Sequence, residues 1–183
     1  MTGHIVIIGA SHAGISCAEQ LRSLGFSGAI TLVDRQSGAP IERPPLSKSY
    51  LGNMPEDDDK FLLRRPEWYD KFQVTMIDGM AVERIDPGLH QICLADGQSL
   101  NYDKLILATG AAPRTLPQVV GLKNVHVLRS PDDAAAVRRA IQTANTAVVI
   151  GGGYIGLEAT ASFRKAGLTV NVVEAAERLL ARV

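Results

Sequence analysis

Cysteine is scarce in this chain, which carries only Cys17 and Cys93 among its 183 residues. Neither belongs to a CxxC or CxxxxC pair, so the sequence offers no local dithiol for relaying electrons and no metal site with cysteine spacing. The four histidines are also scattered singly along the chain. We therefore expect no metal site.

The chain also lacks an excess of charge of one sign and any long apolar run. The 19 Lys and Arg residues balance the 19 Asp and Glu residues, which argues against binding to nucleic acid or to an anionic membrane. No apolar run approaches the roughly 20 residues of a membrane span, and the first residues do not follow the pattern of a signal peptide. We expect a soluble cytoplasmic protein with no nucleic-acid or membrane partner.

Glycine, in contrast, is placed in a clear pattern. The turns Gly9–Gly14 (GASHAG) and Gly151–Gly156 (GGGYIG) each follow an apolar run of strand type and precede an amphipathic segment. A second apolar run then ends on an acid, Asp34 in the first copy and Glu174 in the second. The glycines at 9, 14 and 25 recur 142 positions later, at 151, 156 and 167. The chain therefore repeats one nucleotide-binding pattern.

Each residue type in the turn suits a dinucleotide pyrophosphate. Gly9 and Gly151 close their strands where a side chain would obstruct the turn into the helix, and Gly14 and Gly156 let that helix lie close to its strand. Gly153 has no Cβ, so phosphates can approach the backbone N–H groups at the positive end of the following helix. The acid can accept hydrogen bonds from ribose hydroxyls and repels a 2′-phosphate.

The two copies differ at their middle position. The second is a complete GxGxxG, whereas the first has Ser11 in place of the middle glycine, so the Ser11 hydroxyl must point away from the phosphate or bond to it. Glycine-rich turns also join strands to helices for packing alone. Because strand, helix, second strand and acid are all present twice, we favour nucleotide binding at both turns. Two bound dinucleotides suggest electron transfer between them.

The sequence predicts an α/β fold in which two Rossmann-like nucleotide-binding units are separated by an inserted β-meander. The prolines at 40, 44 and 45 argue against a helix before residue 46, and the acids of 55–60 suggest a solvated loop rather than metal ligands. The expected elements are strands at 4–9 and 29–34, helices at 13–25, 46–51, 66–72 and 131–143, a meander at 80–109 that ends in the apolar run 104–110, and a second unit that begins at 146.

We place the boundary between the units in the loop at 111–116, which divides the chain into domains at 1–113 and 114–183. The second unit stops one strand and a few residues after its helix. At 183 residues the chain is also short for two complete doubly wound domains. We therefore expect the second unit to be truncated, with a partly uncovered parallel sheet.

Four segments together resemble the FAD-dependent pyridine nucleotide reductases that serve ferredoxins and rubredoxins in oxygenase systems, within the pyridine nucleotide-disulphide oxidoreductase superfamily. They are GASHAG with Asp34, ERPPLSK at 42–48, LATG at 107–110 and GGGYIGLE at 151–158. The RPPLSK segment separates this group from its dithiol-containing relatives. The resemblance covers the whole chain as the N-terminal part of such a reductase. It implies FAD in the first unit and NADH in the second.

The resemblance also implies the contacts of each cofactor. Asp34 or Arg35 meets the adenosine ribose, Val82 contacts the adenine through its backbone, and Arg43 and Lys48 lie along the flavin and its phosphates. The other implied FAD contacts are Gly9, Ser11, Ala13 and Gly14 in the turn, Thr109 and Gly110 at the end of the strand beneath the flavin, and Arg129, which closes over the cofactor. The implied NADH contacts are Gly151, Gly153, Ile155, Gly156, Glu158 and Glu174.

Lys48 and Glu158 are the candidate catalytic pair. A fixed cation beside the flavin stabilises the negative charge that reduction places near N1, and so raises the flavin potential. Lys48 fits that role by resemblance, and in the family it pairs with a glutamate that matches Glu158. The alternative is a surface lysine and an exposed helix residue without a shared function.

Glu174 favours NADH over NADPH, because a carboxylate at the end of the second strand repels a 2′-phosphate. Arg178 and Arg182 follow closely and weaken that preference. We expect NADH to be the preferred nucleotide.

Without a dithiol, electrons from a flavin must leave to an external acceptor. The resemblance implies a small iron-sulfur electron carrier, a ferredoxin or a rubredoxin, so we predict an NADH-dependent reductase of such a carrier. A flavoprotein that reduces oxygen differs only in the acceptor. The alternative of a different class is a non-catalytic fragment with at most weak nucleotide binding.

Overall fold

The structure, a computed structural model, describes residues 3–52 and 58–181. The described residues form two compact units, one made of 3–42 and 59–111 and the other of 43–52, 58 and 112–181. The chain passes between the units at 111/112, and residues 43–52 group with the second unit. The predicted division into domains at 1–113 and 114–183 stays a prediction. Which nucleotide each unit binds stays a prediction. Residues 55–57 of the predicted charged loop lie outside the described part, and the turn η2 (Asp58–Phe61) follows them.

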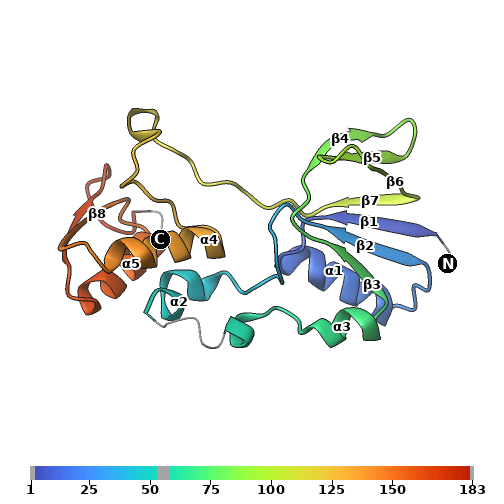
Figure 1. Cartoon of the computed structure of the whole chain (residues 1–183), viewed down its shortest axis with the longest axis horizontal. Coiled ribbons are helices and arrows are strands. Elements are labelled where there is room, and N and C mark those ends of the chain that lie inside the picture. Colours follow the sequence, from blue (N-terminus) through green and yellow to red (C-terminus); the bar gives the residue numbers. More distant parts are fainter. Residues whose placement is uncertain (1–2, 53–57, 182–183) are drawn as a thin grey trace. The chain divides into compact units, whose positions relative to one another are not determined.

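A four-stranded parallel sheet forms the centre of the first unit, in the order β3-β2-β1-β7 (Figure 1). Helices α1 and α3 lie on one face of this sheet, and a three-stranded antiparallel sheet lies on the other. This is the predicted α/β arrangement, with the strand–turn–helix–strand pattern of the first glycine turn at its centre. The elements are β1 (His4–Ile8), α1 (His12–Ser23), β2 (Ala29–Val33), α3 (Pro66–Lys71), β3 (Val74–Ile77) and β7 (Lys104–Leu107).

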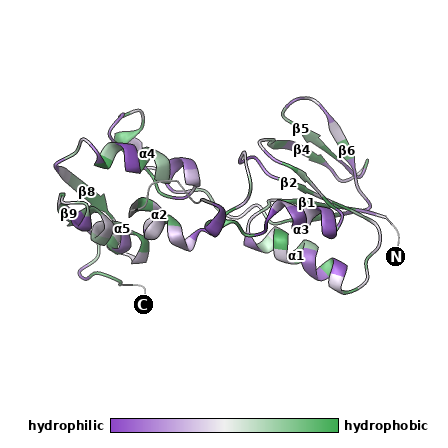
Figure 2. Cartoon of the chain, turned by 60° about the horizontal axis from the view of Figure 1, so that its bottom comes forward, coloured by the Kyte–Doolittle hydropathy of each residue, from purple (hydrophilic) through white to green (hydrophobic). Residues whose placement is uncertain are grey.

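Both faces of β1 are buried, which explains why its sequence is an uninterrupted apolar run. Ile5 and Ile7 pack with Ile15 of α1 on one face, whereas Val6 packs with Ile92 on the other. Along the helices, by contrast, hydrophobic and hydrophilic residues alternate in bands (Figure 2), as expected where one side of a helix is buried and the other faces water. The first unit therefore has a core on each side of its parallel sheet.

Strand β3 is missing from the predicted elements. Its four residues, VTMI, come shortly after α3 and pair parallel with β2, with Val74 opposite Ile30 and Ile77 opposite Val33. A run of four residues is too short to show a periodicity that separates strand from helix. Only the neighbouring strand identifies this segment as part of the sheet.

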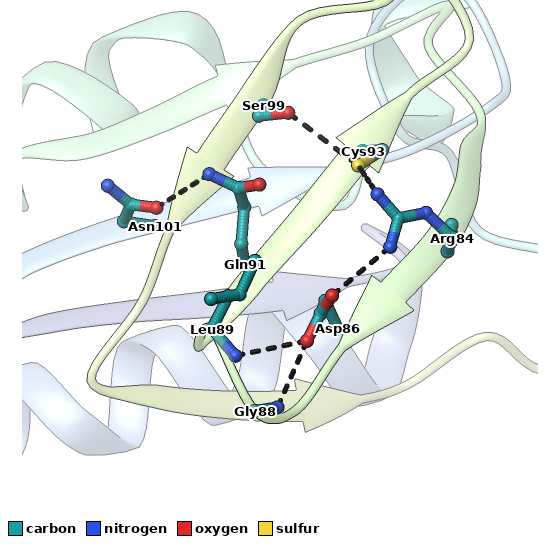
Figure 3. Close-up of polar contacts among 8 residues, drawn as sticks. All are labelled: Arg84, Asp86, Gly88, Leu89, Gln91, Cys93, Ser99 and Asn101. Carbon is teal, nitrogen blue, oxygen red and sulfur yellow. Dashed lines mark hydrogen bonds and ion pairs between the residues drawn. The ribbon is translucent and has the colours of Figure 1, made fainter.

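The predicted meander at 80–109 is correct for three strands and wrong for its end. The antiparallel strands are β4 (Val82–Asp86), β5 (Gln91–Leu94) and β6 (Ser99–Asn101). In the turn between β4 and β5, the Asp86 carboxylate accepts hydrogen bonds from the N–H groups of Gly88 and Leu89 at 3.1 and 3.0 Å (Figure 3). The run 104–107 leaves this sheet as β7 and pairs parallel with β1. Leu105 packs with the hydrophobic cluster that contains Val6, whereas the adjacent Ile106 packs with the cluster that contains Ile7. Both faces of β7 are therefore covered at these positions, which explains why adjacent residues of the strand are apolar.

The second unit contains a smaller parallel sheet. Strands β8 (Thr146–Ile150) and β9 (Thr169–Val173) are hydrogen-bonded to each other, and helix α5 (Tyr154–Lys165) connects them. Helix α4 (Pro131–Ile141) begins with a capping box, in which Ser130 and Asp133 each accept the other's backbone N–H. The other described elements of this unit are η1 (Pro44–Ser47), α2 (Ser49–Gly52) and η3 (Pro117–Val119).

The helix predicted at 46–51 is divided into η1 and α2, and the prolines do not exclude a helical turn. Pro44 and Pro45 occupy the first two positions of η1, where a missing N–H costs little because these N–H groups have no partner within a helix. Lys48 follows with φ −118° and ψ −110°, outside the helical region, and separates η1 from α2. Ser47 and Lys48 therefore lie at the end of a tight turn and not inside a helix.

Candidate nucleotide-binding sites

The first glycine turn depends on glycine for two physical reasons. Gly9 has φ +107°, and a Cβ on it would lie 2.2 Å from the carbonyl oxygen of Ala108, where the chain leaves β7. A Cβ on Gly14 would lie 1.9 Å from the carbonyl oxygen of Gly9. Helix α1 therefore begins directly against the turn, at the carboxyl end of β1.

Asp34 is held at this turn by backbone hydrogen bonds. Its Oδ2 accepts the N–H of Ala10 at 2.6 Å, and its Oδ1 accepts the N–H of Gln36 at 2.9 Å. Each carboxylate oxygen has a second lone pair for a ligand hydroxyl. The carboxylate predicted to meet a ribose is thus fixed beside the residues predicted to meet the phosphates.

The other residues predicted for the first unit lie at the same edge of its sheet. Ser11 is the N-cap of α1, Ala13 and Arg35 are exposed, and Thr109 follows β7 across the turn from Gly9. The N–H of Met80 donates to the carbonyl of Asp34 at 2.9 Å, which places the start of β4, and with it Val82, beside the end of β2. Gly110, the last of the residues predicted to contact FAD at this edge, has φ +67°.

The second turn repeats the local geometry of the first. Gly151 has φ +108°, and a Cβ on Gly156 would lie 2.0 Å from the carbonyl oxygen of Gly151. Glu174 accepts the N–H of Gly152 at 2.6 Å through Oε2 and that of Ala176 at 2.8 Å through Oε1. The acid at the end of the second strand therefore holds the turn in both copies.

Gly153 is different, because the packing of the protein does not require a glycine there. A Cβ at this position would meet no atom of the described residues within 4 Å. Gly153 is the N-cap of α5, so the space beside it adjoins the free N–H groups of the helix, and Ile155 in the first turn of α5 is 56% exposed. The open space and the donors fit a pyrophosphate group.

A cavity of about 300 Å³ lies in the second unit, beside the first turns of α5. Its lining includes Arg43, Lys48, Arg129, Tyr154 and Glu158. The predicted residues Arg43 and Arg129 are in contact, since Nη1 of Arg43 donates to the carbonyl oxygen of Arg129 at 3.1 Å. The structure thus brings together the predicted residues of the segment 43–48, of the N-terminal side of α4 and of α5.

Lys48 and Glu158 form an ion pair, with 3.0 Å between Nζ and Oε1. The Lys48 side chain is 53% exposed and that of Glu158 is 31% exposed. The pKa of Glu158 is lowered, first by the hydrogen bond from the Ser47 hydroxyl and then by Lys48. The two residues are therefore paired and not independent surface groups, while their catalytic role stays a prediction.

Ser47 is part of this cluster although the sequence did not single it out. Its Oγ donates to Oε2 of Glu158 at 2.5 Å, and Ser47 is 5% exposed. The serine stands next to Lys48 in the RPPLSK segment, but only the packing of η1 against α5 brings it to a carboxylate 111 residues away. No local pattern could have identified the contact.

Within the described residues, no group of three or more His, Cys, Asp and Glu side chains is arranged to hold a metal ion. In the same part of the chain, no helix is both long and apolar enough to cross a membrane. Cys17 and Cys93 form no disulfide, and burial raises the pKa of the Cys17 thiol.

Residues 3–183 match the family described as pyridine nucleotide-disulphide oxidoreductase. The chain is 46% identical over 179 residues to rhodocoxin reductase of Rhodococcus erythropolis, with 97% of this chain and 42% of that protein covered. It is 40% identical over 184 residues to putidaredoxin reductase CamA of Pseudomonas putida, with 98% and 43% covered. The crystal structure of the ferredoxin reductase for the CYP199A2 system of Rhodopseudomonas palustris matches with a TM-score of 0.93 and 37% identity, over 98% of this chain and 44% of that one. The chain thus spans less than half the length of these relatives.

Proposed function

Since the chain belongs to the pyridine nucleotide-disulphide oxidoreductase family, we propose that it provides the two nucleotide-binding units of an NADH-dependent flavoprotein reductase, with FAD in the first unit and NADH in the second. One observation carries this proposal. Both glycine turns are held by a carboxylate from the end of the second strand, Asp34 on Ala10 and Glu174 on Gly152, each at 2.6 Å. Two such turns in one chain fit two dinucleotides.

In the first unit, the turn from Gly9 to Gly14 and the free N–H groups of α1 would hold the pyrophosphate of FAD. Asp34 keeps one lone pair on each oxygen for the adenosine ribose, with exposed Arg35 beside it. When bound, FAD accepts a hydride from a nicotinamide and passes electrons on one at a time. The residues of this unit bind and orient that group.

In the second unit, Gly153 leaves open the approach to the start of α5, and Glu174 lies beside it. We propose that Glu174 accepts the ribose hydroxyls of NADH and repels the 2′-phosphate of NADPH. We propose that the ammonium of Lys48, held by Glu158, is the fixed positive charge that would favour electron uptake by a flavin bound beside it.

The chemistry of the chain and the names of its relatives support a small external protein as the electron acceptor. With two unpaired cysteines the chain offers no dithiol to receive electrons. Two relatives are named as reductases of putidaredoxin and of ferredoxin. We propose a small iron-sulfur carrier of the ferredoxin or rubredoxin kind as the partner.

The test uses the purified 183-residue chain. FAD binding is followed by quenching of flavin fluorescence, and NADH oxidation is then measured with added FAD and cytochrome c, with and without a ferredoxin. We expect FAD binding, faster turnover with NADH than with NADPH, and a rate that rises with ferredoxin. Faster oxidation of NADPH would contradict the role of Glu174, and a rate that depends only on oxygen would contradict the carrier.

The exposed face of the β8–β9 sheet favours a second candidate, a fragment that does not catalyse on its own. Val148, Ile150 and Val173 are 63%, 60% and 53% exposed on this face, where parallel sheets are normally covered. A purified chain that is colourless and oxidises no NADH when FAD is added would support this candidate.

A further inference from the structure

Ser47 contacts helix α5 through two different atoms. Its Oγ donates a hydrogen bond to Oε2 of Glu158 at 2.5 Å, and its backbone carbonyl accepts one from Oγ of Ser162 at 3.0 Å. Glu158 and Ser162 are four residues apart, so they lie on the same face of α5, one turn from each other. The turn η1 is therefore held against α5 at two points, and only the first involves the Ser47 side chain.

The hydroxyl of Ser47 holds the Glu158 carboxylate more firmly than the ammonium of Lys48 does. Lys48 is half-exposed, so water screens the ion pair, and the long side chain loses rotamer freedom when the pair forms. The hydroxyl–carboxylate hydrogen bond is shorter, charge-assisted and made by a buried residue. The hydrogen bond from Ser47 is the largest single cause that lowers the pKa of Glu158, and Lys48 lowers it further through a hydrogen bond and through its charge.

Glu158 in turn determines where the Lys48 ammonium lies. Nζ of Lys48 is 3.0 Å from Oε1 of Glu158 and makes a longer contact, at 3.4 Å, with the carbonyl oxygen of Pro44. A carboxylate that cannot rotate gives the flexible lysine one preferred position at the cavity.

We propose that Ser47 is a positioning residue, whose hydroxyl fixes the Glu158 carboxylate and thereby holds the Lys48 ammonium at one place in the cavity of the second unit. The benefit of that ammonium to a flavin rests on the proposed function, whereas the contacts from Ser47 to Lys48 do not. Without the hydroxyl, the carboxylate can rotate away and the ammonium returns to solvent.

The other charged or titratable groups that line this cavity are Arg43 and Arg129, which come from the segments before η1 and α4, and Tyr154 in the first turn of α5. Arginine and tyrosine side chains do not titrate in the acidic range where glutamate does. A titration of the Glu158 carboxyl therefore reports on the Ser47 and Lys48 contacts.

The test is ¹³C NMR of the full chain with labelled glutamate side chains, titrated without nucleotide, with Glu158→Gln to identify the signal. We expect Ser47→Ala to raise the pKa of Glu158 toward the usual glutamate value, and Lys48→Met to raise it as well. Ser47→Thr keeps the hydroxyl and is expected to keep the low pKa. Ser162→Ala, which removes the other contact between η1 and α5, is the matched control and is expected to leave the pKa unchanged.

Two results would overturn the positioning role. One is a Ser162→Ala variant that shifts the pKa as much as Ser47→Ala does, because the effect would then come from loosening of η1. The other is a wild-type pKa at or above the usual glutamate value, a measurement that needs no variant to fold. FAD binding to the same proteins is measured separately. A chain that shows the expected pKa changes but binds no FAD contradicts the proposed function and not the role of Ser47.

Discussion

The two glycine turns have nearly the same local geometry and very different surroundings. Gly9 and Gly151 have φ +107° and +108°, and in both turns an acid holds the next residue's N–H at 2.6 Å. Yet a Cβ on Gly9 would collide with Ala108, whereas one on Gly151 would meet no described atom within 4 Å. The turn is a property of a few consecutive residues, and its enclosure is a property of the strands around it.

The strands that lead into the turns differ in the same way. Val6 and Val148 are equivalent in the repeat, but Val6 is fully buried and Val148 is 63% exposed. Strand β1 lies between β2 and β7, whereas among the described residues β8 pairs only with β9. Similar apolar runs therefore contribute differently to stability, depending on what covers them.

The largest expected difference comes from adding a methyl group at the equivalent glycines. Gly9→Ala combines backbone strain with the collision at Ala108, so we expect the free energy of unfolding to fall by more than ~3 kcal/mol. Gly151→Ala has only the strain of its positive φ, and we expect a loss of about 1–2 kcal/mol. Urea unfolding of both variants measures this, and equal losses would contradict the difference in enclosure.

The equivalent residues Val6 and Val148 test whether burial determines how much the same side chain contributes to the free energy of unfolding. Val6→Ala removes two buried methyl groups and is expected to lower the free energy of unfolding by about 2 kcal/mol. Val148→Ala acts on an exposed side chain and is expected to change it by less than ~0.5 kcal/mol. A large loss for Val148→Ala in the same urea experiment would show that the exposed face of β8 is covered in solution.

The middle positions of the turns test ligand binding more than stability. Gly153→Ser gives the second turn the residue type of Ser11, and the open space at Gly153 accommodates it, so unfolding should change by less than ~0.5 kcal/mol. If that space receives a pyrophosphate, NADH binding should weaken about 10-fold, a loss of ~1.4 kcal/mol. Calorimetric titration with NADH measures the affinity, and an unchanged affinity would exclude a phosphate beside Gly153. Ser11→Gly is the reciprocal variant for FAD.

The smallest expected effect concerns Glu158 of the second unit. The equivalent position of the first unit holds Ser16, so the two copies differ there. The folded-state pKa of Glu158 lies below its ordinary value, so its contribution to stability is present above pH ~5 and disappears as the pH falls through the folded-state pKa. Glu158→Gln should therefore lower the free energy of unfolding near pH 7, by less than ~1 kcal/mol because the pair is partly exposed, and match wild type at an acidic pH below the folded-state pKa. Urea unfolding at both pH values checks the sign. Ser16→Ala, an exposed control in the first unit, should show no such pH dependence.

The sequence predicted the elements that carry a local signal. The two turns, α1, α3, α5 and the acids Asp34 and Glu174 lie where the glycine, proline and apolar patterns place them. Strand β3 was missed and β7 was assigned to the wrong sheet, because both are four-residue strands whose place depends on pairing partners distant in sequence.

The candidate site divides in the same manner. The residues of each turn could be named from spacing, and the family resemblance supplied Lys48 and Glu158. Ser47 could not be found, because its contact with Glu158 depends on how η1 packs against α5.

By itself, the sequence determined the two strand–turn–helix–strand repeats and their acids, because glycine conformation, helix entry and a hydrogen bond to the turn act within about 25 residues. Only the tertiary structure decided that β1 is enclosed while β8 is exposed, and that the segment 43–52 packs on the second unit. The reason is physical. Burial and side-chain pairing depend on which distant surfaces meet, and no local pattern records that.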